Sequence, residues 1–270
     1  MELSKEQHAF FQAFGYLALP AAAFGDIVEE LWAEGERALD TAFDARETGT
    51  VFVPVMADST PCSMRLLHDD RLLQPTRQLL GTEPVLKPAK MARFAGETPW
   101  HRDCHGDLPG LKVVCYLGPA DAGPIPFDIV PASHRDPVGA FIENLLGQAT
   151  PLDEQSGDQL GQSGVPIYRL QVQPGQFLIF DIHVWHANHS CDQRLQWSVT
   201  FLATPRDEDS VDEVAQYVGD FLTRQHSYPV DRFPYLPPAW ERGEGSSPLL
   251  STLQRTGVLS RYLQHFGAGR

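Results

Sequence analysis

The sequence is poor in lysine and in positive charge. It contains only four lysines (Lys5, Lys87, Lys90 and Lys112), and 35 acidic residues outnumber 21 basic ones, for a formal net charge of −14. Nucleic acids and anionic membrane surfaces require basic patches on a partner. We therefore expect neither as a partner, although a local group of arginines can still bind an anionic small molecule.

Long apolar runs and paired cysteine motifs are missing too. No run approaches the roughly 20 apolar residues that a membrane span needs, and residues 1–6 are polar, unlike a signal peptide. The cysteines lack the spacing of a zinc ribbon or a CxxC redox site. We expect free thiols in a reducing compartment and a cytoplasmic protein. The cysteines are Cys62, Cys104, Cys115 and Cys191.

The length and composition are those of one globular domain. The chain has 270 residues, 42% hydrophobic and 21% charged, and β folds of this length often stay single. We find no repeat and no linker. We expect a single domain over 1–270, with a helical part at 1–80, a core at about 84–204 and a helical extension at 205–270.

Helix signals lie at the start of the chain. Ser4 and Gln7 have capping-box spacing, and Gly15 ends the apolar stripe that follows. Asp26 and Glu29 predict the cap of a second helix. Further helices are expected at about 69–80, 207–224 and 247–266, the last split at Gly257.

Short strand patterns separated by Gly, Pro and Asp turns fill residues 98–202, which is typical of a sandwich or jelly roll. Pro54 makes one earlier strand an edge strand, because proline cannot donate to a ladder. A loop-rich insertion at 136–164 is predicted to be a lid or a substrate loop. The expected strands are 16–19, 50–56, 84–94, 100–105, 111–117, 125–130, 165–172, 176–181, 184–187 and 194–202.

His101 and Asp103 are the first candidate metal ligands. They are two residues apart, so on a strand they share a face, and an imidazole beside a carboxylate provides two legs of the facial triad of non-haem Fe(II) sites. His105 and Asp107 have the same spacing and form a rival pair.

The third leg should be a distant histidine. The segment 180–190 offers three of them, His183, His186 and His189. Arg194 follows shortly after, and on its strand it shares a face with Gln196, Ser198 and Thr200. A polar face that begins with arginine is typical of a lined barrel interior.

The order of these features resembles the phytanoyl-CoA dioxygenase family of Fe(II)/2-oxoglutarate oxygenases. The resemblance covers roughly residues 5–205. It implies a mainly β fold with flanking helices and a double-stranded β-helix (jelly-roll, cupin-like) core, with Fe(II), 2-oxoglutarate and O2. The motifs that carry it are 99–103 (PWHRD), 123–124 with 130–135 (GP, VPASHR), 174–181 (PGQFLIFD), and 188–190 (NHS) with Arg194.

The resemblance implies roles for single residues. His101 and Asp103 are chosen over the rival pair because the family places an aromatic residue just before the ligand histidine. Arg194 would bind the distal carboxylate of 2-oxoglutarate, and Ser190 could add a hydroxyl. His105 is left as either a substrate contact or a surface residue.

The third ligand stays open between two histidines. The family spacing counted back from Arg194 leads to His183, whereas the spacing counted forward from Gly175 leads to His186. We favour His186, because the alternative leaves only Asp181 and Ile182 to turn the chain.

A row of basic residues precedes the His101 motif. Lys87, Lys90 and Arg93 lie on the expected strand at 84–94. We expect a solvated strand face, with binding of a cosubstrate carboxylate as the alternative.

The function expected from the resemblance is oxidation, chiefly hydroxylation, of a C–H bond in a small-molecule metabolite. Asp103 favours this outcome because halogenating relatives lack the carboxylate. Scarce lysine beside common arginine is consistent with a GC-rich bacterial source and thus, by analogy, with specialised metabolism. The alternatives are a cupin-type dioxygenase or isomerase without 2-oxoglutarate, and an inactive small-molecule-binding jelly roll. The substrate and the oligomeric state are left open.

Overall fold

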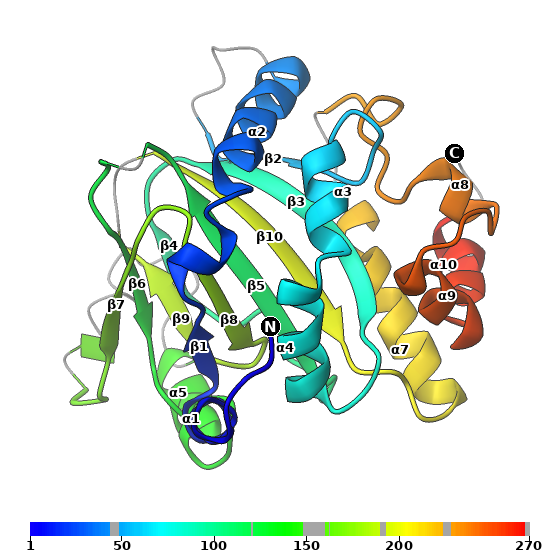
Figure 1. Cartoon of the computed structure of the whole chain (residues 1–270). Coiled ribbons are helices and arrows are strands. Elements are labelled where there is room, and N and C mark those ends of the chain that lie inside the picture. Colours follow the sequence, from blue (N-terminus) through cyan, green and yellow to red (C-terminus); the bar gives the residue numbers. More distant parts are fainter. Residues whose placement is uncertain are drawn as a thin grey trace.

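Two antiparallel β-sheets lie against each other, and helices cover the outer face of the larger sheet (Figure 1). The structure, a computed structural model, describes residues 1–43, 49–119, 121–147, 160–161, 163–189, 193–223 and 228–267. The predicted β core with flanking helices is confirmed. Within the described residues, no helix is long and apolar enough to cross a membrane.

The larger sheet has six strands. Edge strand β2 contains Pro54, as predicted, and central strand β10 pairs with both β5 and β3. In spatial order the strands are β1 (Tyr16–Ala18), β8 (Phe177–Asp181), β5 (Gly110–Leu117), β10 (Arg194–Leu202), β3 (Val85–Phe94) and β2 (Val51–Pro54).

The smaller sheet has four strands and holds the first histidine motif. Its second strand, β9, is only three residues long and is paired on both sides. In spatial order the strands are β4 (Thr98–His101), β9 (His186–Asn188), β6 (Ile125–Ile129) and β7 (Tyr168–Val172).

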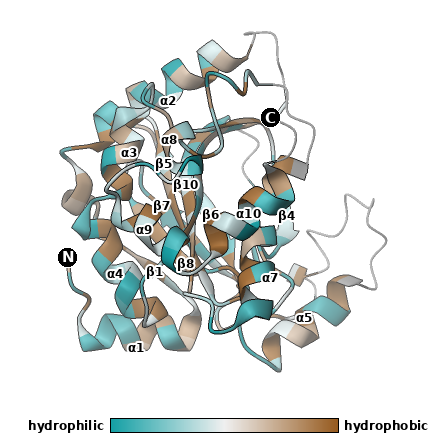
Figure 2. Cartoon of the chain, turned by 90° about the vertical axis from the view of Figure 1, so that its right-hand side faces the viewer, coloured by the Kyte–Doolittle hydropathy of each residue, from teal (hydrophilic) through white to brown (hydrophobic). Residues whose placement is uncertain are grey.

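Helices before and after the core strands pack around the sheets. Their ribbons mix hydrophilic and hydrophobic residues, as expected for helices with one face on a core (Figure 2). The N-terminal elements are α1 (Lys5–Phe14), η1 (Ala21–Phe24), α2 (Val28–Ala42), α3 (Pro61–Leu67) and α4 (Asp70–Leu80). The later ones are α5 (Val138–Gly147), α7 (Glu208–Gly219), η2 (Asp220–Thr223), α8 (Pro238–Glu241), α9 (Pro248–Arg255) and α10 (Val258–Phe266).

The insertion expected as a lid is described only in part. Helix α5 forms its first half and buries Ile142. Residues 148–159 and 162 lie outside the described residues, so the lid stays a prediction.

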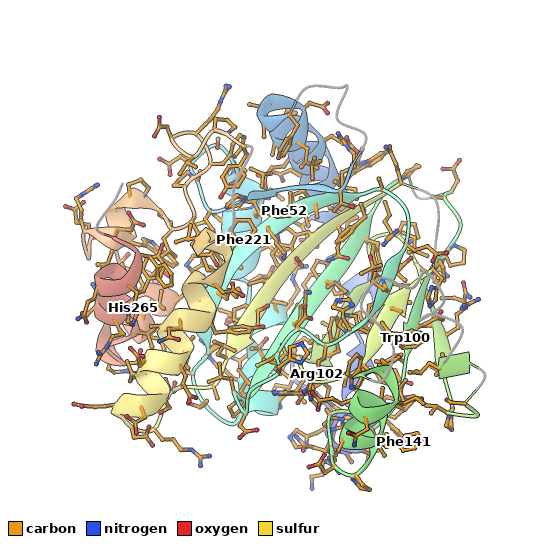
Figure 3. All side chains as sticks on the ribbon, turned by 180° about the vertical axis from the view of Figure 1, so that it is seen from behind. Phe52, Trp100, Arg102, Phe141, Phe221 and His265 are labelled. Carbon is orange, nitrogen blue, oxygen red and sulfur yellow. The ribbon has the colours of Figure 1, made fainter. Side chains whose placement is uncertain are left out.

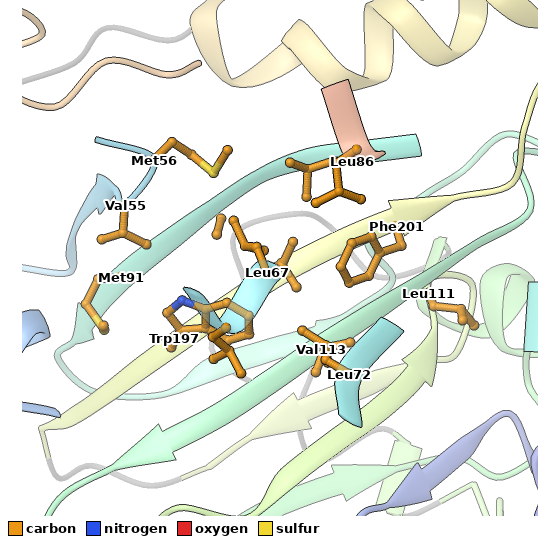
Figure 4. Close-up of a cluster of buried hydrophobic side chains, with 14 of the residues drawn as sticks. Val55, Met56, Leu67, Leu72, Leu86, Met91, Leu111, Val113, Trp197 and Phe201 are labelled. Atoms are coloured by element: carbon orange, nitrogen blue, oxygen red, sulfur yellow. The ribbon is translucent and has the colours of Figure 1, made fainter. Parts of the chain in front are cut away.

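The main hydrophobic core lies between the six-stranded sheet and the helices. Alternation along β10 sends Trp197 and Phe201 into it, where they meet Val113 from β5 and Leu67 and Leu72 from the helices (Figure 4). The other face of β10 is thereby left to the space between the sheets. The predicted division of this strand into two faces is confirmed.

Two helix-end predictions have opposite outcomes. The capping box of Ser4 and Gln7 is present, and Gly15 ends α1 with a φ of 80°, a left-handed conformation that favours glycine. Asp26 as the cap of α2 was wrong: the cap residue is Ile27 without a side-chain bond. Instead, the Asp26 carboxylate forms an ion pair with Arg71 at 2.6 Å.

Glu34 on α2 carries a buried carboxylate, 2% exposed, that joins two helices. It accepts hydrogen bonds from the backbone N–H groups of Cys62 (2.6 Å) and Ser63 (2.8 Å) and from the Ser63 hydroxyl (2.6 Å). These amides open α3, where the orphan N–H groups and the helix dipole favour an anion.

Replacing this carboxylate tests its contribution to stability. Glu34→Ala leaves two helix-end amides buried without acceptors and should lower the free energy of unfolding by about 2–4 kcal/mol in a urea titration. Glu29→Ala, at an exposed position of the same helix, is the control and should cost about 0.5 kcal/mol or less. Equal losses in both variants would contradict this account.

Candidate metal centre and cosubstrate pocket

A cavity of about 320 Å³ lies between the two sheets. Strands β3, β5 and β10 form one wall, residues of β4, β6 and β9 face them, and Tyr217, Asp220, Phe221 and Tyr235 close one side. The volume is in the range of small-molecule sites.

Two histidines lie side by side on neighbouring strands of the smaller sheet. His101 on β4 pairs directly with His186 on β9, and their ring centroids are 4.2 Å apart. Each Nδ1 lies within hydrogen-bond distance of a backbone carbonyl oxygen, that of Pro99 for His101 (2.8 Å) and that of Val184 for His186 (2.9 Å). A carbonyl only accepts, so each Nδ1 donates and each Nε2 keeps its lone pair for a ligand.

Asp103 completes this group two residues beyond the end of β4. Its backbone N–H donates to the Ile182 carbonyl at 2.9 Å, and its Oδ1 accepts from the Lys112 ammonium at 2.6 Å. Oδ2 is buried, has no hydrogen-bond partner in the part of the chain that the structure describes, and lies 3.8 Å from His186 Nε2.

The protonation states suit a divalent cation. Burial lowers the pKa of His186 to about 3, and burial also lowers the pKa of His101 against the pull of Asp103. Burial raises the pKa of the Asp103 carboxyl, but Lys112 and the two imidazoles outweigh this and hold it well below its usual range. At neutral pH the group is therefore two neutral imidazoles and one carboxylate, which are the forms that bind metal.

The residues present fit a metal ion. One ligand atom from each of His101, Asp103 and His186 lies within 4.8 Å of the others. Without a metal ion, Asp103 Oδ2 is a buried charged atom that no described residue meets with a hydrogen bond. Two histidines and one carboxylate on one side of a cavity are the donor set of non-haem Fe(II) sites.

His183, the rival third ligand, lies in the turn between β8 and β9. Asp181 Oδ1 accepts both its backbone N–H (2.9 Å) and its ring Nδ1–H (2.8 Å), and its Nε2 lies 2.7 Å from the Gly106 carbonyl oxygen. Burial lowers its pKa, but the bonds with Asp181 and Cys104 outweigh this and raise it to about 10. Both ring nitrogens are thus engaged away from the metal group.

The remaining histidines of the two motifs lie outside the group. His105 is exposed and accepts a hydrogen bond from Arg102 at 3.0 Å, and Asp107 is exposed too. His189 lies 3.8 Å from Asp128 and 3.6 Å from Glu97. The structure places His105 at the surface, which is one of the two roles expected for it.

Arg194 lies at the start of β10 with its side chain in the cavity wall. The residue is 5% exposed, and its guanidinium donates to the Gly96 carbonyl (2.6 Å) and to the Thr98 hydroxyl (2.7 Å). The Cζ carbon of Arg194 lies 4.9 Å from the centre of the Phe94 ring. Tyr116 also hydrogen-bonds to it. A buried cation held this way is oriented for a carboxylate ligand.

The prediction that the basic residues of β3 lie on a solvated face was wrong for two of the three. Lys87 and Lys90 line the cavity, because the C-terminal segment around Phe221 covers this face. Arg93 lies outside the cavity wall and forms ion pairs with Glu36 and Asp40 of α2. The candidate Ser190 lies outside the described residues.

Sequence reasoning missed Lys112 and the residues of the C-terminal segment. Strand β5 is otherwise buried almost throughout, so a single lysine in such a run was a usable signal for a buried charge partner. Tyr217, whose hydroxyl donates to the Asp103 carbonyl at 3.2 Å, gave no signal, because it lies on an ordinary amphipathic helix.

No protein-family model matches the chain, and neither does any curated protein. HygX from Streptomyces hygroscopicus, with nickel and 2-oxoglutarate bound, is 24% identical, with a TM-score of 0.55 over 76% of this chain and 88% of that one. HygX with iron bound, compared separately, is 20% identical over the same shares with the same TM-score.

A second similar structure is that of the non-haem α-ketoglutarate-dependent epimerase SnoN from nogalamycin biosynthesis. It is 16% identical, with a TM-score of 0.53 over 74% of this chain and 83% of that one. Identities this low establish the fold alone. The chain therefore has the jelly-roll fold of these non-haem iron enzymes.

Proposed function

We propose that this protein is an Fe(II)/2-oxoglutarate-dependent oxygenase of the phytanoyl-CoA dioxygenase family that oxidises a C–H bond of a small molecule. One observation carries the proposal: Asp103 Oδ2 is buried without a hydrogen bond to any described residue, beside two histidines whose Nε2 atoms point toward it. The similar structures add support, since HygX has been found with iron and with 2-oxoglutarate.

His101, Asp103 and His186 would hold the iron on one face, which leaves the opposite face open for cosubstrate and O2. Lys112 holds Oδ1 of Asp103 at 2.6 Å and so presents Oδ2 alone to the metal. Phe127 stacks on the His186 ring at 5.3 Å between centroids and excludes water from that side. When bound, iron with 2-oxoglutarate and O2 supplies the oxidising chemistry, with succinate and CO2 as coproducts.

Arg194 would bind the distal carboxylate of 2-oxoglutarate. It lies in the same cavity as the three donors, its guanidinium is held by Gly96 and Thr98, and burial strengthens a charge-assisted pair. Ser190 as a second contact stays a prediction. The buried arginine disfavours a cupin-type enzyme that does not bind 2-oxoglutarate. The three converging metal donors disfavour an inactive binding protein.

The substrate would be a small molecule, as the cavity volume indicates. HygX has been crystallised with hygromycin B as well as 2-oxoglutarate, which supports a role in specialised metabolism. Hydroxylation is the outcome we propose. Succinate release that depends on substrate tests the reaction class, and the product mass tests the outcome: one added oxygen means hydroxylation, and an unchanged mass means a rearrangement or epimerisation instead.

Iron binding should depend on His101 and Asp103. Because each supplies a ligand atom, His101→Ala and Asp103→Ala should each weaken Fe(II) binding by at least about 100-fold, beyond the 10–100-fold of indirect effects. His105→Ala, an exposed residue of the same motif, is the control and should bind iron normally. Anaerobic Fe(II) titration measures all three, and near-normal affinity in either ligand variant would contradict the assignment.

Arg194→Ala should weaken 2-oxoglutarate binding selectively. Loss of a buried charge partner costs about 2–5 kcal/mol, or about thirtyfold to several thousandfold in affinity. The affinity for Fe(II) should stay within a few fold, since Arg194 is not a ligand. Arg93→Ala, outside the cavity, serves as the control. An unchanged 2-oxoglutarate constant in Arg194→Ala would rule out this role.

Two histidine variants decide the third ligand. His186→Ala should abolish the weak visible charge-transfer band that anaerobic Fe(II) and 2-oxoglutarate give in this enzyme class. His183→Ala should keep the band, because its ring bonds to Asp181 and Gly106. A lost band in His183→Ala beside a preserved band in His186→Ala would reverse the assignment.

A further inference from the structure

The cavity wall has an excess of positive charge in an acidic protein. Five basic residues line it against two carboxylates, Asp103 and Asp220, although the chain carries a net charge of −14. Glu143, outside the wall, compensates Arg102 at 2.7 Å. Glu97, also outside the wall, acts on the charge of Arg194, and with both outside acids counted the wall keeps one more positive than negative charge.

Three of the basic residues have acidic partners and one lysine does not. Lys87 pairs with Asp220 and Lys112 with Asp103, both at 2.6 Å, and Arg102 has Glu143. In the part of the chain that the structure describes, Lys90 has neither an ion pair nor a hydrogen bond.

The surroundings of Lys90 are aromatic. Its Nζ lies 5.7 Å from the centre of the Phe52 ring and 6.0 Å from that of Phe221. These two rings lie together at one end of the sheet, with centroids 4.9 Å apart (Figure 3). They attract a cation weakly, but they cannot replace the hydrogen bonds that an ammonium makes in water.

Lys90 is also remote from the arginine assigned to the cosubstrate. Arg194 pairs with Phe94 in the β3–β10 register, whereas Lys90 pairs with Ser198. Four residues along a strand correspond to about 13 Å. One end of the cavity thus has a cation held for 2-oxoglutarate, and the other end has a second cation without a counterion.

Lys90 is partly buried, and among the described residues it has no ionic partner, which is unfavourable for the folded protein. Removal of its ammonium from bulk water, together with Lys112 and Lys87, lowers the pKa of Lys90 to about 7. An anion that enters the cavity would remove this cost and at the same time hold the proton on the amine.

We propose that Lys90 binds an anionic group of the substrate, a carboxylate or a phosphate, while Phe52 and Phe221 pack against the part of the substrate beside it. The inference rests on the proposed function, because iron and 2-oxoglutarate bring charges that cancel and leave the excess of the wall to the substrate. The substrate class is therefore an organic anion with an apolar portion.

Anion binding to the enzyme loaded with Fe(II) and saturating 2-oxoglutarate, without oxygen, tests the proposal. Inorganic phosphate and acetate are the probes, at constant ionic strength with chloride as the reference. At least one of them should raise the Tm of the wild-type protein, by mass action, and preference between them distinguishes phosphate from carboxylate. Lys90→Met should bind the effective anion at least tenfold more weakly, Lys90→Arg should retain part of the binding, and the exposed Lys5→Met should match wild type.

The alternatives give different results. Equal anion binding by wild type and Lys90→Met, or none by wild type, overturns the inference. A raised 2-oxoglutarate constant in Lys90→Met with unchanged phosphate and acetate binding also overturns it, by making Lys90 a cosubstrate ligand. Anion binding that depends on Lys90 in a protein that binds no iron or 2-oxoglutarate would support the anion site and refute the proposed function.

Stability without ligand provides a second measurement that a folding defect cannot imitate. Lys90→Met keeps the length of the side chain and removes the unpaired charge, so its Tm should exceed that of the wild type below pH 7. Between pH 7 and about 10.5 the unfolded lysine holds its proton while the folded one has lost it. The wild type therefore gains stability with pH in this window, and the difference in Tm should shrink. The charged groups that affect this titration are Lys87, Lys112, Asp103 and Asp220.

Discussion

The direct pairing of β4 with β9 is the constraint on which the candidate site depends. It places His101 opposite His186, residues 85 positions apart in the sequence, and turns both Nε2 atoms to one point. Each ring is then fixed by a carbonyl of its own strand or of the turn before it, so the orientation comes from the backbone. A shift of one residue in this register would point the two rings to opposite sides of the sheet.

Charge balance explains how the carboxylate of this group is kept in the interior. Asp103 is partly buried and has Lys112 on one oxygen, and its other oxygen is buried without a hydrogen bond to any described residue. The same logic recurs at Glu34, where amides of a helix end take the place of the lysine. Specific donors meet both carboxylates and offset the cost of removing them from water, and both positions link segments that are distant in the sequence.

Much of this arrangement followed from local sequence patterns. Strand parity sufficed to put Arg194 with Ser198 toward the interior, because a two-residue period is a property of the backbone. It did not suffice for Asp103, which lies beyond the end of β4 and reaches His101 from the bend that follows the strand. The preference for His186 rested on which turn can be short; the structure adds that the Asp181 carboxylate makes that turn around His183.

The environment of Lys90 could not be inferred in this way. Whether a strand face is exposed to solvent depends on which segments pack on it. Here the packing residues are Phe221 and Tyr235, more than 100 residues later in the sequence. Lys112 is an intermediate case, since a lysine in a buried strand is unusual enough to suggest a partner but does not say which one.

Two parts of the chain line the cavity, and they differ in how freely their residues can be substituted. Core strands contribute His101, His186 and Arg194, which are tied to register and cannot move without loss of the sheet, and Asp103 follows directly after β4. The C-terminal segment contributes Tyr217, Phe221 and Tyr235, which reach the cavity from a helix and from irregular chain. Substitutions there can reshape the far end of the pocket while the candidate metal group and Arg194 stay in place. The fold thus separates the part of the cavity that is free to vary from the part that the sheets hold fixed.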